Sequence, residues 1–339
     1  MKQILFQITS YHQFIVALSY CRNDTIVDVI ITNYAVGKTF YDFYDKVKEV
    51  NFFNKVYWYD EINYLPPSRK NIIKTFYYNR IGQKKHVKNT LSIDLNSYDD
   101  IYVFHDYFTI GAWLVNDNIK YNLLEDTMNS FPLTVKWRKN YDFQPEKYWW
   151  MKLALKVGYT HKICGNADCC VEIQVSSLEN LPPLKKEKIK IVNRNETIKN
   201  LSSQYKPLVL ELFDISDDMF YNVNKSVLIL TEPFFNDGFF QEEADQIQLY
   251  QKLIDSFPLD SKVFIKPHPR DKTNYSKINN AIVLKSNFPI EILQYIENAS
   301  FDKAVTFSST SVNTITFVKE KIILGKDKIK DYLNNTKND

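Results

Sequence analysis

Short runs of β-branched and other apolar residues alternate with stretches of helical length along the chain, and this alternation limits the folds open to it. A first strand is expected over residues 4–8, a helix over 14–18 and a second strand over 25–32. A strand, a helix and a strand within about thirty residues form a βαβ unit, whose strands lie in a parallel sheet. Ser10 is expected to cap the first helix, and a further strand is expected over residues 99–105. The same alternation starts again at residue 226 and continues to residue 324, with helices expected over residues 289–298 and 308–318. We therefore expect an α/β protein.

Length and composition predict two domains. The chain has 339 residues, of which 45% are hydrophobic and 24% charged, a composition typical of globular proteins but long for one ordinary domain. Residues 195–224 are polar and aperiodic, and they separate the two sets of alternating elements. We expect domains over residues 1–210 and 211–339, each Rossmann-like, facing a central cleft.

Several classes of protein and site are disfavoured. A net charge of +3 is too small to indicate nucleic-acid binding. The cysteines fit a reducing compartment, and their spacing beside His161 matches no common zinc site, so no metal is expected; they are Cys21, Cys164, Cys169 and Cys170. The N-terminal apolar run is too short for a signal peptide, and no stretch of 18 apolar residues occurs. We expect a cytoplasmic protein.

The segment Lys266-Pro267-His268-Pro269 directly follows an expected strand at residues 262–265. The two prolines hold the chain extended and rigid, so His268 is fixed in a stiff turn. Ligands of open α/β sheets bind at the carboxyl ends of the strands, where a histidine beside a lysine suits an anion. The alternative is a strand-end histidine that only bonds a neighbouring carbonyl.

Two adjacent carboxylates, Glu125 and Asp126, end another expected strand at residues 120–124. Adjacent side chains at a strand end face different ways, so one is expected to point at a ligand and the other to brace the turn. This arrangement suits a general base. We expect Glu125 to be the base and Asp126 the brace, with a solvated acidic turn or a helix cap as the alternative.

Further segments recur at strand ends, and together they resemble the bacterial sialyltransferases of glycosyltransferase family 52. The resemblance rests on six segments, namely 10–13, 124–126, 229–233, 265–270, 288–293 and 307–311. Members carry an acidic pair usually followed by Gly, a His-Pro motif and a Ser-Ser/Thr motif. Here Thr127 follows the pair, and Glu232 stands where Gln is common.

The resemblance implies a GT-B fold and metal-independent, inverting transfer of a sialic or related nonulosonic acid. The donor would be a CMP-sugar, and the acceptor a lipid-linked glycan of a bacterial capsule, lipopolysaccharide or lipooligosaccharide; no cofactor is implied. It implies catalytic roles for Glu125, Asp126 and His268, and contact of donor sugar or acceptor with Ser10, Tyr11 and Gln13. The residues implied for CMP binding are Thr231, Glu232, Lys266, Pro269, Glu291, Ser308, Ser309 and Thr310.

For these residues the chemistry is consistent with the resemblance. The hydroxyls of residues 308–310 would meet the phosphate at a strand-to-helix turn, and Glu291 would accept the ribose hydroxyls. Asp237 and Asp245 are reserve candidates for the base or an acceptor contact. Plain helix capping is the alternative for the hydroxyls, as is a dipole-stabilised first-turn glutamate for Glu291.

Other functions stay open. They are a CDP-polyol phosphotransferase, a Kdo-type capsule transferase, a transferase that uses another nucleotide sugar, and an inactive glycan-binding subunit. Residues 136–156 mix lysine, arginine and aromatic residues, which predicts either peripheral contact with the inner membrane or a helix packed through its tryptophans. The acceptor, the linkage, the particular nonulosonic acid and the oligomeric state are not predicted.

Overall fold

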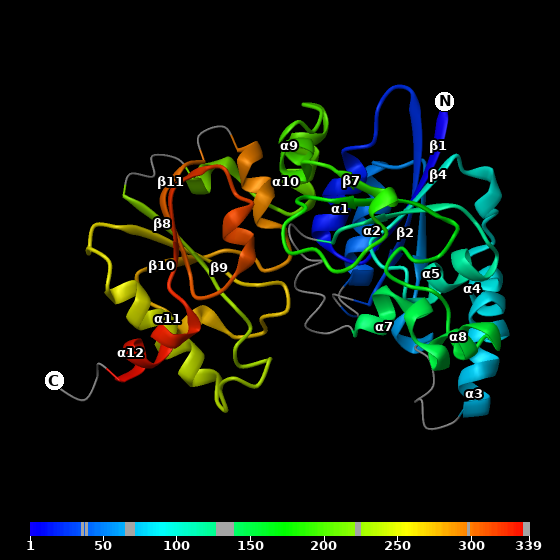
Figure 1. Cartoon of the computed structure of the whole chain (residues 1–339). Helices are drawn as coiled ribbons and strands as arrows, with labels where there is room; N and C mark the ends of the chain where they lie inside the picture. The colour runs from blue at the N-terminus through cyan, green and yellow to red at the C-terminus, as the bar shows by residue number, and fades with distance from the viewer. Residues whose placement is uncertain are drawn as a thin grey trace. The chain divides into compact units, whose positions relative to one another are not determined.

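The computed structural model describes residues 1–34, 37, 40–64, 72–126, 139–220, 225–296 and 299–334. The chain forms two compact units, Met1–Leu201 and Ser202–Asp339 (Figure 1). The sequence placed the boundary after residue 210, whereas here it falls after residue 201, so that helix α10 (Tyr205–Leu212) belongs wholly to the second unit.

In unit 1, the described residues form a seven-stranded parallel sheet in the order β3-β2-β1-β4-β5-β6-β7. Its strands are β1 (Lys2–Ile8), β2 (Thr25–Thr32), β3 (Lys55–Tyr59), β4 (Asp100–Val103), β5 (Tyr121–Leu124), β6 (Cys170–Val175) and β7 (Ile189–Ile191). The sequence analysis did not predict β3 or β6. Strand β6 begins at a buried cysteine, so the cysteine cluster belongs to the core of the sheet.

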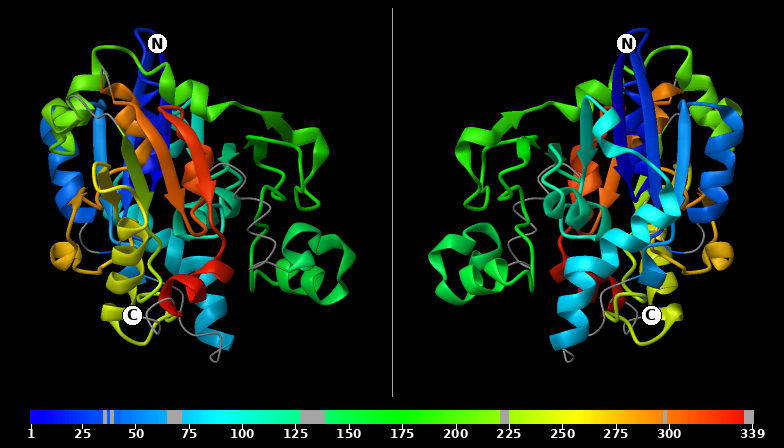
Figure 2. Two further views of the ribbon diagram at one scale, coloured as in Figure 1. Left: turned by 90° about the vertical axis from the view of Figure 1, so that its left-hand side faces the viewer. Right: turned by 90° about the vertical axis from the view of Figure 1, so that its right-hand side faces the viewer.

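Helices cover both faces of this sheet, which explains why its strands are apolar on both sides. They are α1 (Tyr11–Leu18), α2 (Phe40–Val50), α3 (Ile72–Tyr77), α4 (Gln83–Leu91), α5 (Thr109–Asn116), α7 (Asn140–Phe143), α8 (Trp149–Lys156) and α9 (Arg194–Lys199). On one face, Phe14 of α1 packs edge-on against Phe43, Phe52 and Phe53. On the other, Trp113 of α5 belongs to a separate buried cluster. Helices α7 and α8 (green) lie at the periphery of unit 1 (Figure 2).

In unit 2, the described residues form a five-stranded parallel sheet in the order β10-β9-β8-β11-β12. The strands are β8 (Ser226–Leu230), β9 (Lys262–Lys266), β10 (Ala281–Val283), β11 (Phe301–Thr306) and β12 (Val318–Ile323). Helices α11 (Glu243–Asp255) and α12 (Ile329–Asn334) pack together beside one core cluster. A second group of buried aromatic rings includes Phe220, which stacks on Phe264 of β9.

Two predictions for unit 2 were wrong. Helices were expected over residues 289–298 and 308–318, but the structure has only the 3₁₀ turns η8 (Ile290–Tyr295) and η9 (Thr310–Asn313). Residues 310–318 are rich in Thr, Val and Ile, whose stiff side chains disfavour an α-helix. Neither segment therefore supplies the helix N-terminus that the sequence analysis expected at the phosphate.

Each sheet has one point at which the strand order reverses. In unit 1 this point lies between β1 and β4, and in unit 2 between β8 and β11. Ligands of such sheets bind outside the carboxyl ends of the strands at this switch point.

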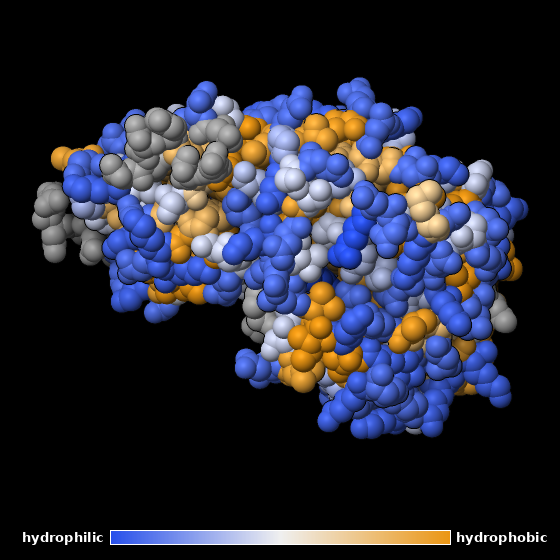
Figure 3. Space-filling model, turned by 90° about the horizontal axis from the view of Figure 1, so that it is seen from above, coloured by the Kyte–Doolittle hydropathy of each residue, from blue (hydrophilic) through white to orange (hydrophobic). Residues whose placement is uncertain are grey.

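The surface seen from above is mostly hydrophilic, with hydrophobic residues gathered in a few places (Figure 3). Among the described residues, no helix is long and apolar enough to cross a membrane.

Candidate functional site

In unit 1, the side chain of Asp126 lies near residues that follow two other strands. Its carboxylate accepts a hydrogen bond from the Gln13 side-chain amide. The Gln13 amide oxygen accepts in turn from the backbone N–H of Thr9, at 2.6 Å, just after β1. His105, which follows β4, places its Nε2 4.0 Å from Asp126 Oδ2. Asp126 therefore sits at the switch point, and 35% of its side chain is exposed.

Glu125 is oriented differently, because its side chain is buried in unit 1. Only 2% of the residue is exposed. Its Oε2 accepts from the backbone N–H of Ser176 at 2.7 Å and from the Ser176 hydroxyl at 2.6 Å, just after β6. The buried Arg194 lies near enough for the charge of Glu125 to favour its protonated form, although burial lowers the pKa of Arg194 to about 10. Glu125 thus joins the ends of β5 and β6.

The first loop of unit 1 contains three predicted ligands, of which two have structural roles and one contacts the acidic pair. Ser10 caps α1, as expected, by accepting from the backbone N–H of Gln13. Tyr11 is 6% exposed and packs edge-on against Phe40 and Phe43, and burial raises its pKa to about 12. Gln13 bonds the acidic pair, through the carboxylate of Asp126.

His105 is a site residue that the sequence analysis missed. It lies two residues after the end of β4, and its Nδ1 is 3.1 Å from the Tyr107 hydroxyl. The signal was a histidine at the end of the strand expected over residues 99–105, next in order to the strand that carries the acidic pair. Thr127, which departs from the family pattern, lies outside the described residues.

In unit 2, Glu232 spans the switch point. Its Oε1 accepts from the Thr306 hydroxyl at 2.7 Å, at the end of β11, and from the backbone N–H of Ser308. Its Oε2 accepts from the Tyr250 hydroxyl at 2.9 Å. Glu232 is 7% exposed and bonded through both oxygens, so its carboxylate fastens β8 to β11 rather than facing solvent.

A second buried carboxylate, Asp271, organises the loop after β9. It accepts from the hydroxyls of Thr231 and Tyr275, each at 2.7 Å, and from the side-chain amide of Gln246 at 3.1 Å. The Thr231 hydroxyl also accepts from the backbone N–H of His268 at 3.2 Å. Thr231 is 1% exposed, so it positions the histidine loop from within. Asp271, which directly follows the segment 265–270, was not predicted from the sequence to have a role.

His268 is partly exposed at the end of this braced loop. Its Nδ1 accepts a hydrogen bond from the backbone N–H of Arg270 at 3.1 Å, which assigns the ring proton to Nε2. Burial lowers the pKa of His268 to about 4, and the cations of Arg270 and Lys266 act in the same direction. The ring is therefore a neutral donor at pH 7, with Nε2–H as its donating group.

The two cations beside His268 already have partners. Lys266 is 4% exposed, and its Nζ donates to the carbonyls of Pro267 at 2.8 Å and Ser286 at 3.1 Å. Burial lowers the pKa of Lys266 to about 7, although Glu291 acts in the opposite direction. Arg270 pairs with Asp237, with Nη1 2.9 Å from Oδ1.

Of the remaining predicted ligands in unit 2, four are accessible to solvent and Glu291 is buried. Ser308, Ser309 and Thr310 are partly or fully exposed, as is Pro269, and the Ser309 hydroxyl lies 2.7 Å from that of Ser311. Glu291 is 8% exposed and accepts from the Thr314 hydroxyl at 2.9 Å. Of the reserve candidates, Asp237 is engaged by Arg270, and Asp245 lies in the first turn of α11.

The chain is similar in sequence or in fold to several known proteins. An uncharacterized protein of Haemophilus influenzae is 31% identical over 157 residues, which are 44% of this chain and 48% of that relative, so the chain spans about half of the relative's length. The MnaA structure of S. aureus with UDP covers 100% of this chain and 88% of its own, at 11% identity and a TM-score of 0.50. The UDP-GlcNAc 2-epimerase of Methanocaldococcus jannaschii, with UDP-GlcNAc and UDP, covers 100% and 93%, at 14% identity and a TM-score of 0.48.

These likenesses concern the fold. Two parallel sheets covered by helices, together with the likeness to the MnaA structure, confirm the GT-B-like class that the sequence predicted. The resemblance to a family is confirmed separately, since the model of glycosyltransferase family 52 matches residues 46–328. That match spans most of the chain, and the protein belongs to glycosyltransferase family 52.

Proposed function

We propose that the protein is an inverting sialyltransferase, which transfers a nonulosonic acid from a CMP-sugar to a glycan hydroxyl. In this reaction the acceptor oxygen attacks the anomeric carbon, and the bond from that carbon to the phosphate oxygen breaks. The hydroxyl proton passes to a base, and CMP leaves as a phosphate monoester. Membership of the family supports glycosyl transfer, and the resemblance of the acidic-pair, His-Pro and Ser-Ser/Thr segments to those of bacterial sialyltransferases supports the proposal of CMP and of inversion.

The proposed base is Asp126. The sequence analysis favoured Glu125, but the two hydrogen bonds from Ser176 and the burial of Glu125 leave it no access to an acceptor. Asp126 is partly exposed at the switch point, where Gln13 holds its carboxylate. His105, with its Nε2 4.0 Å from Asp126 Oδ2, can share the proton that the carboxylate receives. Glu125 acts as a brace.

The proposed ligand of the departing phosphate is His268. A phosphate oxygen gains charge as the glycosidic bond breaks, and a fixed N–H aimed at it stabilises the transition state more than the ground state. The Nε2–H of His268 suits this role, because Arg270 holds Nδ1 as the acceptor. The hydroxyls of Ser308, Ser309 and Thr310 are the proposed further donors to CMP, and Glu291 the proposed ribose contact.

The fixed tautomer of His268 is the observation that carries the proposal. His268→Ala should lower turnover with CMP-sialic acid by about 10²–10⁴-fold, with a normal circular dichroism spectrum. His86→Ala, in α4 of unit 1, is the matched control and should retain turnover. A thermal shift with CMP but not with UDP is expected for the wild type. A shift with UDP alone, or full turnover without His268, would reject the proposal.

A further inference from the structure

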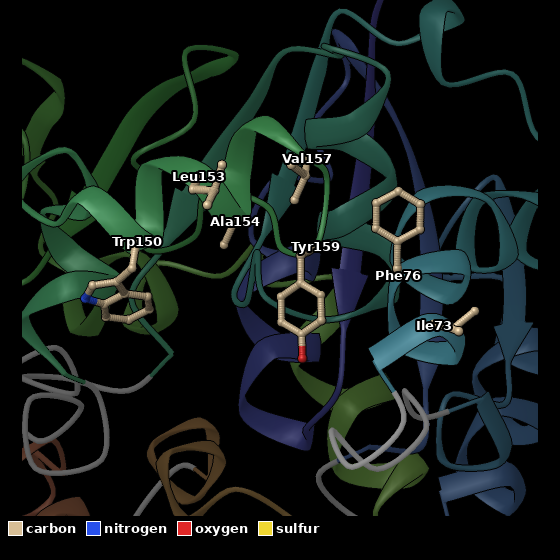
Figure 4. A pocket seen from close by; sticks show the side chains of 7 residues that line it. All are labelled: Ile73, Phe76, Trp150, Leu153, Ala154, Val157 and Tyr159. Atoms are coloured by element: carbon tan, nitrogen blue, oxygen red, sulfur yellow. The ribbon is translucent and has the colours of Figure 1, made fainter.

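Helices α3 and α8, which lie about 75 residues apart in the sequence, enclose a groove on the surface of unit 1. Its volume is about 370 Å³. Ile73 and Phe76 contribute from α3, and Trp150, Leu153 and Val157 from α8 and its end, with Tyr159 between them (Figure 4). The lining is almost wholly apolar.

The side chains of this groove are not packed away from solvent. Ile73 is 82% exposed and Leu153 is 53% exposed. Trp149, at the first turn of α8, is 77% exposed. Trp149 is thus not packed into unit 1, whereas Trp150 contacts the ring of Tyr141 at 4.8 Å between centroids. A contiguous exposed apolar surface marks an interaction site more often than a single exposed residue does.

The charges along the same segments are of one sign. No Asp or Glu occurs in the sequence over residues 62–93 or over residues 147–167, whereas lysines occur in both ranges and arginines in the first. On α8 the charged residues are Lys152 and Lys156, and both are exposed. The acid that faces α4 from α5 is Asp117, which pairs with Lys84 and Lys88. Exposed lysines, a tryptophan and aliphatic side chains thus lie together on the solvent-facing side of α8.

We propose that this surface, the α3–α8 groove with Trp149, Lys152 and Lys156, docks on an anionic lipid bilayer. Tryptophan rings favour the headgroup level of a membrane, and lysines beside them can reach lipid phosphates. The groove between the helices accommodates acyl-chain carbons, because its walls offer hydrocarbon contact and few polar groups. A protein partner would need acidic residues opposite these lysines as well as an apolar ridge, whereas a bilayer supplies both chemistries over any area.

This proposal goes beyond the proposed transfer reaction and does not depend on it. Its test measures binding of the full chain to vesicles, with neither donor nor acceptor present. Vesicles of phosphatidylglycerol and phosphatidylcholine at 1:3 should sediment the protein at low salt, and pure phosphatidylcholine should sediment much less. Raising the salt to 1 M, where the Debye length falls to about 3 Å, should weaken the electrostatic part.

Matched variants separate the two contributions. Lys152→Glu with Lys156→Glu should lower partitioning by at least about 30-fold, since each cation near an anionic surface contributes about fivefold. Lys199→Glu with Lys330→Glu changes the net charge equally at exposed lysines of α9 and α12, and should lower it much less. Leu153→Ser should lower partitioning by about tenfold, and Leu259→Ser, at a fully exposed residue, should leave it unchanged.

The proposal is overturned if the wild type does not sediment with anionic vesicles, or if the α8 variants sediment as the wild type does. It is also overturned if both lysine pairs have equal effects, because a diffuse attraction then explains binding. Sedimentation velocity without lipid tests the remaining alternative, in which a second copy of the chain covers the groove. A change of oligomeric state in Leu153→Ser, with vesicle binding retained, would assign the groove to a second copy of the chain instead.

Discussion

Replacing Glu125 by Gln and Asp126 by Asn removes one negative charge in each case, from side chains in different surroundings. In Glu125→Gln, two hydrogen bonds from Ser176 to a carboxylate become bonds to a neutral amide. Bonds to charged groups contribute about 1.5–3 kcal/mol and neutral ones about 1 kcal/mol. The buried Arg194 also loses a favourable neighbour. We expect a loss of about 2 kcal/mol in the free energy of unfolding.

For a unit of the size of Met1–Leu201, that loss corresponds to a Tm lower by roughly 4–8 °C. Asp126→Asn changes a partly exposed side chain, so its effect on stability should stay within about 0.5 kcal/mol. Its transfer rate should nevertheless fall by about 10²–10⁴-fold, because the amide cannot accept the acceptor's proton. CMP affinity should be retained in both variants, since the proposed nucleotide ligands are elsewhere in the chain.

Chemical denaturation, calorimetry with CMP and a transfer assay with CMP-sialic acid measure these three quantities. If Glu125→Gln abolishes transfer without loss of stability, while Asp126→Asn transfers normally, the roles proposed for the two acids are reversed. If both variants transfer at the wild-type rate, neither carboxylate is the base.

Three further outcomes are expected. Activity should survive EDTA, as the family resemblance predicts, and loss that Mg²⁺ restores would point to another class of transferase. Lys266→Met should abolish a rise in the free energy of unfolding between pH 7 and pH 10.5. In that range the buried lysine, whose pKa is about 7, binds fewer protons than the same lysine in the unfolded chain. Denaturation at pH 7 and 9.5 measures this rise, and the same rise in the wild type and the variant would contradict the prediction. Gly111→Ala should lower the free energy of unfolding by about 1–3 kcal/mol, because the added Cβ would lie 2.4–2.6 Å from backbone atoms of Asp106. Alanine otherwise favours helices, so a variant that is more stable in thermal unfolding would refute this contact.

The alternation of strands and helices could be predicted from the sequence because it depends on local residue types. β2 falls on the predicted residues 25–32, and Ser10 caps α1 as its position indicated. The tertiary bonds of the site were not readable. Glu125 looked like a base because apolar residues precede it, and nothing local shows that Ser176, some fifty residues later, bonds its carboxylate.

The C-terminal motifs illustrate the same limit. His268 in a stiff turn was a sound prediction, since two prolines act locally. That Lys266 points inward to two carbonyls follows from the position of the next loop, which the sequence does not encode at short range. The helices expected after β10 and β11 are 3₁₀ turns instead. The prediction followed the regular alternation of strands and helices and gave too little weight to the β-branched residues, which disfavour an α-helix.

The engagement of the two cations beside His268 has a consequence for the dependence of donor binding on ionic strength. Lys266 is bound to carbonyls and Arg270 to Asp237, so a phosphate at this loop would meet N–H and O–H groups without formal charge. Short hydrogen bonds of this kind are little affected by salt, whereas attraction between exposed charges is screened. The KM for the donor should therefore change little between low and high salt, even where sedimentation of the same protein with anionic vesicles falls.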